Sequence, residues 1–193
     1  MSHKIYTTEA FVCGSLDSGT SDKSYLLFTE ESGMLFATAR SVREEKSKQR
    51  YALQDFSRIR VSLVKGKSGW RIGSVEALGN PFLLATTRLE RALVNFVFMQ
   101  LRRYVHGEIM LPSVYRDLTE VLEKVQTFES SWAKVGQVFL LRLLSELGYI
   151  ASESPWETLV SAPTIESAMS HYTERMVGQV EAVIEKGRQA SHL

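Results

Sequence analysis

The hydrophobic period of this chain changes once, near residue 80, and this change constrains the fold more than any other feature. Before Ala77, apolar residues alternate in short runs separated by turn-forming residues, which is typical of β-strands. After Asn80-Pro81, apolar residues recur every three to four positions, which is typical of amphipathic helices. We therefore predict an α+β protein in which residues 1–79 form a domain of strands and residues 80–193 form a helical domain.

The N-terminal part is predicted to contain five strands. Their ranges are 8–15, 25–29, 34–39, 56–65 and a return strand that begins at Trp70. Composition predicts turns at 16–23, 30–33 and 66–69, and a long loop at 40–54 where apolar residues are sparse. Short strands at such close spacing suit a small barrel of the OB-fold type.

The C-terminal part is predicted to be an all-α helical bundle. Helical spacing covers residues 89–104, 112–125, 131–147 and 165–185. The third of these helices is apolar over much of its circumference, so we expect it at the centre of the bundle. Residues 151–163, which contain Ser and Pro, are expected to connect it to the last helix.

Composition excludes several classes of protein. No run of 18 apolar residues exists, so no membrane span is expected, and the N-terminus lacks the apolar core of a signal peptide. We therefore expect a cytoplasmic protein. Cys13 is the only cysteine and is expected to be a small buried strand residue. One cysteine and four scattered histidines predict no zinc or other metal site.

Catalysis and cofactors are not expected either. The chain has no Walker-type phosphate loop, no dinucleotide fingerprint and no HExxH motif. Gly66-Lys67-Ser68 lacks the upstream glycine and the following helix of a phosphate loop. The glutamates of the helical half are expected to solvate helix faces. We therefore predict a protein that is not an enzyme and uses no cofactor.

Basic residues concentrate in one window, residues 40–71. It holds ten Lys and Arg against three acidic residues, a net charge of +7 in a chain whose total is +1. The ten are Arg40, Arg43, Lys46, Lys48, Arg50, Arg58, Arg60, Lys65, Lys67 and Arg71. One concentrated basic window in an otherwise acidic chain indicates a site for a polyanion. The alternative is that these side chains only solvate a surface.

Aromatic residues are interleaved with this charge. Bases of single-stranded nucleic acid stack on exposed aromatic rings while phosphates bind Lys and Arg. Phe36, Tyr51, Phe56 and Trp70 lie in or beside the basic window, although each could instead belong to the core. We predict a nucleic-acid site made of the ten basic residues, with Phe36, Tyr51 and Trp70 as the stacking candidates.

The chain also resembles the RecO family of bacterial recombination mediators. The matching segments are EAFVCGS, SDKSYLLFTEESGMLFATARSVR and KSKQRYALQDFSRIRVSLVKGKSGWRI, followed in the helical half by RRYVHGE and FLLRLLSELGY. The resemblance implies an OB-fold followed by a helical domain, in a DNA repair protein of the bacterial nucleoid. It implies binding of single- and double-stranded DNA, annealing of complementary strands and loading of recombinase onto coated DNA. The implied partners are single-strand-binding protein, RecR and, indirectly, RecA.

The chain departs from the family pattern in one place. Many RecO proteins carry a four-cysteine zinc module after the LGY segment, whereas here LGYIASESPWETLV follows without a cysteine. We therefore predict a short form that lacks this module. Two alternatives stay open: an OB-fold module that binds RNA, and a scaffold whose basic loop binds an acidic protein. Salt dependence and a comparison of DNA with RNA would separate them.

A site for a partner's tail is predicted in the helical half. Single-strand-binding proteins in this family's setting end in an acidic tail with an apolar residue and a free carboxylate. Such a tail needs an apolar groove and a cation. We predict that Arg142, with Arg102 or Arg103, binds it, because Arg142 interrupts the most apolar helix. The alternative is that Arg142 pairs with Glu146, four residues later.

Overall fold

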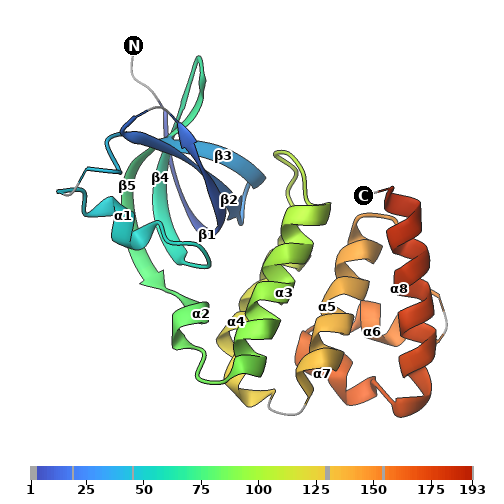
Figure 1. The fold of residues 1–193 in the computed structure, drawn as a ribbon. Helices are drawn as coiled ribbons and strands as arrows, with labels where there is room; N and C mark the ends of the chain where they lie inside the picture. The colour runs from blue at the N-terminus through green and yellow to red at the C-terminus, as the bar shows by residue number, and fades with distance from the viewer. Residues whose placement is uncertain (1–3, 19, 45, 129–130, 154, 193) are drawn as a thin grey trace. The chain divides into compact units, whose positions relative to one another are not determined.

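The computed structural model describes residues 4–18, 20–44, 46–128, 131–153 and 155–192. The chain divides into two compact units, which we call the barrel unit (residues 1–84 and 105–111) and the helical unit (residues 85–104 and 112–193). Figure 1 shows strands in the N-terminal part of the chain and long helices in the C-terminal part. The predicted α+β fold class is confirmed.

The barrel unit is a closed barrel with the strand order β1-β2-β3-β5-β4. Its strands within the described residues are β1 (Ile5–Ser18), β2 (Asp22–Thr29), β3 (Gly33–Ala39), β4 (Arg58–Gly66) and β5 (Gly69–Gly79). β1 pairs antiparallel with both β2 and β4, and a short parallel pairing of β3 with β5 closes the barrel. This confirms the predicted five-stranded OB-fold barrel.

Every second side chain along the strands points into the barrel and fills its interior. Ile59, Val61 and Leu63 of β4 belong to the buried core, while Arg60 between them is exposed. Each fully buried aliphatic side chain of this kind stabilises the fold by roughly 1.5–3 kcal/mol relative to exposure. Cys13 is buried in β1, as predicted.

Two parts of the barrel unit differ from the sequence prediction. β1 continues to Ser18 and β2 begins already at Asp22, so the turn expected at 16–23 is much shorter. A hairpin end that faces water needs no apolar residues, and its polar composition therefore resembled a loop. The loop expected at 40–54 contains a short helix, α1 (Gln49–Ala52), whose last residue, Ala52, is buried together with the following Leu53.

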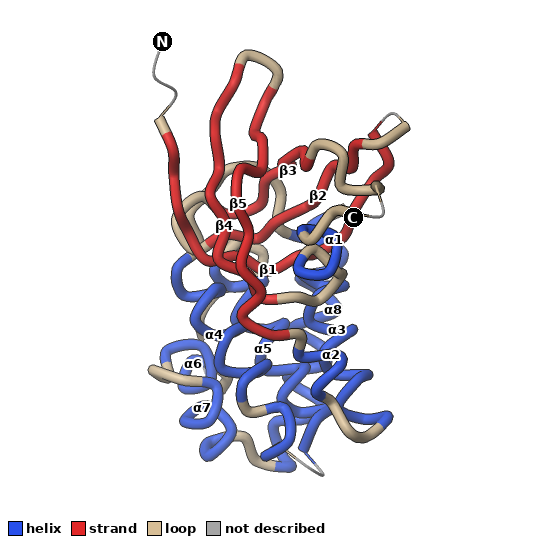
Figure 2. The backbone as a smooth tube through the Cα atoms, turned by 90° about the vertical axis from the view of Figure 1, so that its left-hand side faces the viewer, coloured by secondary structure: helices blue, strands red, loops and turns tan. Residues whose placement is uncertain are grey.

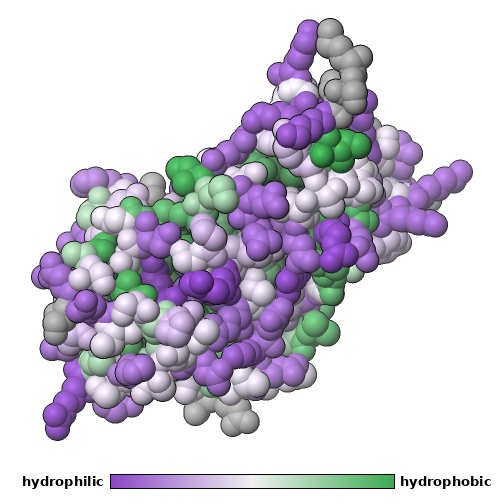
Figure 3. Space-filling view, turned by 180° about the vertical axis from the view of Figure 1, so that it is seen from behind, coloured by the Kyte–Doolittle hydropathy of each residue, from purple (hydrophilic) through white to green (hydrophobic). Residues whose placement is uncertain are grey.

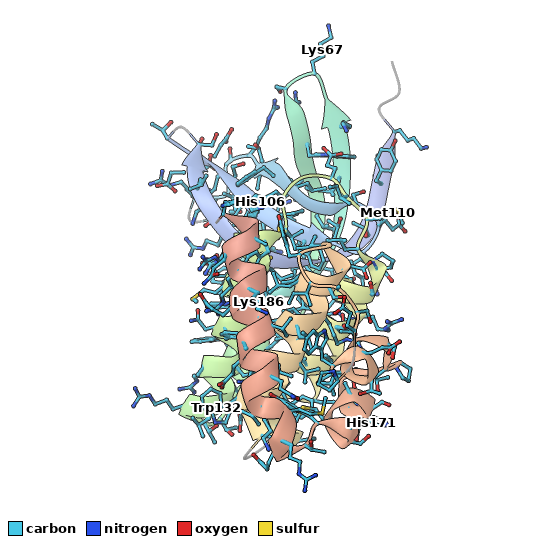
Figure 4. All side chains as sticks on the ribbon, turned by 90° about the vertical axis from the view of Figure 1, so that its right-hand side faces the viewer. Lys67, His106, Met110, Trp132, His171 and Lys186 are labelled. Atoms are coloured by element: carbon cyan, nitrogen blue, oxygen red, sulfur yellow. The ribbon has the colours of Figure 1, made fainter. Side chains whose placement is uncertain are left out.

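The β4–β5 hairpin extends from the barrel (Figure 2). Its turn lies between Gly66 and Gly69, where the sequence predicted it, and Gly69 has the positive φ of +108° that such a turn requires. Lys67 stands at the tip and points away from the barrel (Figure 4). The hairpin therefore presents a cation to solvent.

Residues 105–111 belong to the barrel unit although they lie between two long helices in the chain. The carbonyl oxygen of Gly107 accepts a hydrogen bond from the Met34 amide at 3.1 Å. A Cβ at Gly33 would lie 2.0 Å from the Ile109 carbonyl oxygen, and Gly33 has a φ of +66°. Only glycine fits this contact and this conformation. Segment 105–111, which carries His106 and Met110 (Figure 4), therefore docks on the start of β3.

The helical unit is built around α5 (Trp132–Glu146). The other helices of its described residues are α3 (Arg88–Tyr104), α4 (Pro112–Glu123), α6 (Glu157–Ser161), α7 (Ile165–His171) and α8 (Val177–Ser191), while α2 (Pro81–Leu84) belongs to the barrel unit. α5 packs against α3, α4, α6, α7 and α8, so the predicted central helix is confirmed.

The end of the chain differs from the prediction of one long helix. α7 stops at His171, Tyr172 adopts an extended backbone, and a 3-10 turn at Glu174–Met176 precedes α8. The Tyr172 hydroxyl donates to Gln137 Oε1 at 2.7 Å, so a contact with α5 fixes the break. The connection expected at 151–163 contains α6. These short elements depend on contacts that a local pattern does not reveal.

The face drawn in Figure 3 is mostly hydrophilic, with hydrophobic residues gathered in small patches. In the described part of the chain, no helix combines the length and the hydrophobicity needed to cross a membrane.

Candidate nucleic-acid interface

The predicted basic residues fall into two groups according to their partners. Four of them have carboxylate partners within the barrel unit. Arg43 lies 3.6 Å from Asp17, Arg58 and Arg60 lie 2.9 and 3.2 Å from Glu9, and Lys65 lies 3.0 Å from Glu108. Among the described residues, the other six form no ion pair: Arg40, Lys46, Lys48, Arg50, Lys67 and Arg71.

The ion-paired arginines of β4 belong to a cross-strand charge cluster. Glu9 of β1 lies opposite Arg60 on one side, and Glu76 of β5 lies opposite it on the other. Arg60 contacts both carboxylates, and Arg58 donates twice to Glu9 Oε2, at 2.9 and 3.1 Å. Such pairs each stabilise a sheet by roughly 0.2–1 kcal/mol. Arg58 and Arg60 are therefore partly neutralised before any phosphate approaches.

Four of the six cations without ion pairs lie on the α1 loop, which we define as residues 40–52. Arg40, Lys46 and Lys48 are exposed there. Arg50 Nη2 donates to the Tyr51 hydroxyl at 2.8 Å, and its guanidinium lies 4.8 Å from the centre of the Tyr51 ring. The Tyr51 side chain is 63% exposed. An exposed ring beside a cation, in a basic loop, is an arrangement that suits the binding of single-stranded nucleic acid.

The other aromatic candidates differ in their availability. Phe36 is 50% exposed on β3, opposite Leu26 of β2, on the face that OB-folds use for oligonucleotides. Trp70 is half-buried, its edge lies against Tyr6 and its Nε1 donates to Glu108 at 2.9 Å. Phe56 stacks on Phe82 inside the barrel unit. Phe36 and Tyr51 are therefore the rings most available to a base.

Glu108, on segment 105–111, is a constituent of this surface that the sequence did not suggest. Its carboxylate accepts hydrogen bonds from Trp70 Nε1 and Lys65 Nζ, and the Lys65 ammonium also lies 4.8 Å from the centre of the Trp70 ring. The hydrogen bonds from Trp70 and Lys65 lower the pKa of Glu108 below its ordinary value. Glu108 therefore stays ionised and neutralises Lys65 at neutral pH.

A hollow of about 550 Å³ opens beside the α1 loop. Lys23, Arg43 and Arg50 line it, together with Tyr25, Leu53 and Asp55. Burial raises the pKa of Tyr25, with smaller contributions from the charges of Asp55 and Asp17. Sequence reasoning did not select Lys23, because it lies outside the basic window in a segment that was expected to be a turn.

The three arginines predicted to bind a partner's tail have different environments. Arg102 and Arg103 are exposed in the last turn of α3, but Arg142 is only 7% exposed. Arg142 Nε and Nη2 donate to the two Asp117 carboxylate oxygens at 2.6 and 3.1 Å, so the predicted alternative partner Glu146 is wrong. Arg142 Nη1 donates to three backbone carbonyl oxygens, those of Leu159, Val160 and Ala162. The guanidinium of Arg142 therefore stabilises the helical unit from within, and we no longer place it in a tail site.

The described residues contain no group of three or more His, Cys, Asp or Glu side chains arranged to hold a metal ion. The absence of zinc stays a prediction, which metal analysis of the purified protein would test.

Comparison with known proteins points to one family for the barrel unit. Residues 1–80 match the family described as "Recombination protein O N terminal". Two proteins named "DNA repair protein RecO", from Desulfitobacterium hafniense strains DSM 10664 / DCB-2 and Y51, are each 41% identical over 64 residues. The aligned stretch is 33% of this chain and 23% of each relative. A protein of the same name from Pelotomaculum thermopropionicum is 33% identical over 81 residues, which are 42% of this chain and 32% of the relative.

These matches confirm the predicted resemblance to RecO for the N-terminal part of the chain. The chain matches between about a quarter and a third of the length of these relatives. The family match ends at residue 80 and does not include the helical unit.

Proposed function

We propose that the barrel unit binds single-stranded DNA through the α1 loop and the outer face of β2 and β3. The observation that carries this proposal is the exposed Tyr51 ring with the Arg50 guanidinium over it, in a loop that holds further exposed cations, on a RecO-type barrel. Phosphates bind the cations of the α1 loop, while bases stack on Tyr51 and Phe36. Residues 1–79 are the nucleic-acid-binding domain in this proposal.

For the whole protein we propose the role of a DNA repair and recombination mediator. The match of the barrel unit to RecO and the name of the relatives, "DNA repair protein RecO", support this role. In this role the protein is not an enzyme: it binds single- and double-stranded DNA, anneals complementary strands and helps to load recombinase onto coated DNA. RecR, single-strand-binding protein and, indirectly, RecA are the proposed partners. Arg102 and Arg103 are the remaining candidates for binding an acidic tail.

Charge reversal on the α1 loop tests the DNA site. Arg40→Glu with Lys46→Glu and Lys48→Glu should weaken binding to a labelled single strand at least about tenfold, because three phosphate contacts are lost. Stability should change little, because surface substitutions each shift it by about 0.5 kcal/mol or less. Fluorescence anisotropy and thermal melting measure the two quantities.

A matched control separates a local site from net charge. Arg91→Glu with Arg175→Glu and Lys186→Glu makes the same change of charge on exposed residues of the helical unit. The control should lose far less affinity than the α1-loop variant. An equal loss in both variants would show that the α1 loop is not the site.

The proposed mediator role has its own test. The parent protein should accelerate annealing of complementary strands that are coated with single-strand-binding protein, and the α1-loop variant should not. Normal DNA binding without any acceleration would restrict the function to DNA binding.

A further inference from the structure

The hollow beside the α1 loop has the features of a binding site. Its volume of about 550 Å³ lies within the range of small-ligand sites. Tyr25 and Leu53 form part of its floor, although each exposes only 3% of its area. Three cations, Lys23, Arg43 and Arg50, reach the hollow from β2, from the α1 loop and from α1 itself. The hollow is therefore a depression with a positively charged border.

Asp55 gives the hollow one acidic hydrogen-bond acceptor. Its backbone carbonyl oxygen accepts a hydrogen bond from Asn80 Nδ2 at 3.0 Å, which fixes the backbone of Asp55 just after the α1 loop. An acceptor among cations does not suit a simple phosphate site, because a carboxylate repels phosphate. It suits a ligand that carries both a phosphate and an amino group, as a nucleotide with an amino-bearing base does.

We propose that the hollow takes one unstacked nucleotide of a bound single strand, with its phosphate at Lys23 and Arg50 and the amino group of its base at Asp55. This inference rests on the proposed function, because a strand bound along the α1 loop passes the hollow. Proteins commonly read unstacked bases by hydrogen bonds to the edge of the base.

The arrangement has a consequence for base preference. Carboxylates accept hydrogen bonds from the exocyclic amino group of cytosine, whereas thymine carries an oxygen at the same position. Asp55 therefore favours cytosine over thymine, two bases of the same size. A purely electrostatic strand site would bind both equally well.

Two homopolymers test this preference. Labelled oligo(dC) and oligo(dT) of about 15 nucleotides, the upper range of an OB-fold site, are titrated at mildly alkaline pH. The parent protein should bind oligo(dC) roughly threefold to tenfold more tightly, as one net hydrogen bond predicts. Equal affinities in the parent would overturn the proposal and leave the proposed function intact, whereas no binding of either strand at low salt would overturn the proposed function itself.

Two matched pairs of variants localise the preference. Asp55→Asn should abolish it, because an amide can accept from cytosine or donate to thymine. Glu31→Gln removes the same charge from an exposed turn outside the hollow and should keep the preference. Lys23→Gln should weaken binding and reduce the salt slope by about 0.7, whereas Lys4→Gln, at an exposed residue just before β1 and outside the hollow, should do neither. A preference that survives in Asp55→Asn would refute the assignment.

Competition distinguishes a strand from a free nucleotide. Millimolar dCMP should not displace oligo(dC), because a single nucleotide lacks the phosphate contacts along the α1 loop. Displacement of the labelled strand by dCMP would overturn the proposal in favour of a free-nucleotide site.

Discussion

Arg142 connects three helices of the helical unit through one buried side chain. It lies on α5, pairs with Asp117 on α4 and donates to carbonyl oxygens at and just beyond the end of α6. The last carbonyls of a helix lack partners within the helix, so the guanidinium also caps α6. An arginine can remain in so apolar a helix because these acceptors replace water.

Removing this side chain should destabilise the protein strongly. Arg142→Met leaves the Asp117 carboxylate and three carbonyl groups without their partner, and we expect a loss of about 3–5 kcal/mol in the free energy of unfolding. Urea denaturation measures this loss. Arg116→Met is the control, because Arg116 approaches Asp117 only at 4.0 Å and its side chain is 58% exposed. Similar losses in the two variants would contradict a central role for Arg142.

Tyr51 provides the clearest test of stacking at a single residue. Its ring is 63% exposed, so its replacement changes little inside the fold. Tyr51→Leu should weaken single-strand binding by about 1–3 kcal/mol, the typical contribution of one stacked base. Tyr51→Phe keeps the ring and should keep most of the affinity. If the leucine variant binds like the phenylalanine variant in anisotropy titrations, no base stacks there.

At the scale of elements, segment 105–111 places an acid against the basic β4–β5 hairpin. Met34 and Gly33 hold its backbone, and Glu108 reaches Lys65 and Trp70. A DNA phosphate that approaches Lys65 must therefore displace a carboxylate. We therefore expect segment 105–111 to lower the affinity of this hairpin for polyanions.

Glu108→Gln should therefore strengthen DNA binding. The loss of one competing charge should raise affinity at low salt and steepen the plot of log K against log salt by about 0.7. The pKa of Glu108 in the folded protein is lowered from its ordinary 4.5. The stabilisation from its contacts with Trp70 and Lys65 is therefore fully present above pH 4.5 and is lost as the pH falls through the lowered pKa. A titration at neutral pH thus compares an ionised parent with a neutral variant. Glu146→Gln, an exposed acid of α5, should leave the salt slope unchanged, and equal slopes in all three proteins would contradict the expectation.

Elements with a long, regular period were predictable from the sequence, and elements fixed by distant contacts were not. The alternation of Ile59, Val61 and Leu63 identified β4, and the apolar circumference of α5 identified the central helix. α6 and α1 are only five and four residues long, too short to show a period. The break between α7 and α8 depends on the contact of Tyr172 with Gln137, which lies 35 residues earlier.

At the scale of the whole molecule, the charge of a segment also depends on residues that are distant in the sequence. The basic window has a net charge of +7, but its ion-pair partners Glu9, Asp17, Glu76 and Glu108 all lie outside it. Counting these four acids reduces the local net charge to +3. A count along the sequence therefore overestimates the number of cations in this window that lack an acidic partner.

The number of window cations without acidic partners predicts the salt dependence of DNA binding. Each phosphate contact with a single strand contributes about 0.7 to the slope of log K against log salt. The six window cations without acidic partners among the described residues should give a slope of about −4, or about −5 with Lys23, whereas all ten would give about −7. Titrations of a labelled oligo(dT) across a range of NaCl concentrations measure this slope.

A variant within the cross-strand charge cluster makes the salt experiment decisive. Glu9→Gln removes the carboxylate shared by Arg58 and Arg60, while Arg60 keeps its contact with Glu76, so the slope should steepen by about 0.7, the contribution of one further phosphate contact. The parent would already show a slope near −7 if the paired arginines readily exchanged Glu9 for phosphate, and Glu9→Gln would then add little. A shallow slope in the parent that steepens in Glu9→Gln would instead mean that the cross-strand acids of the barrel limit how many phosphates the protein binds.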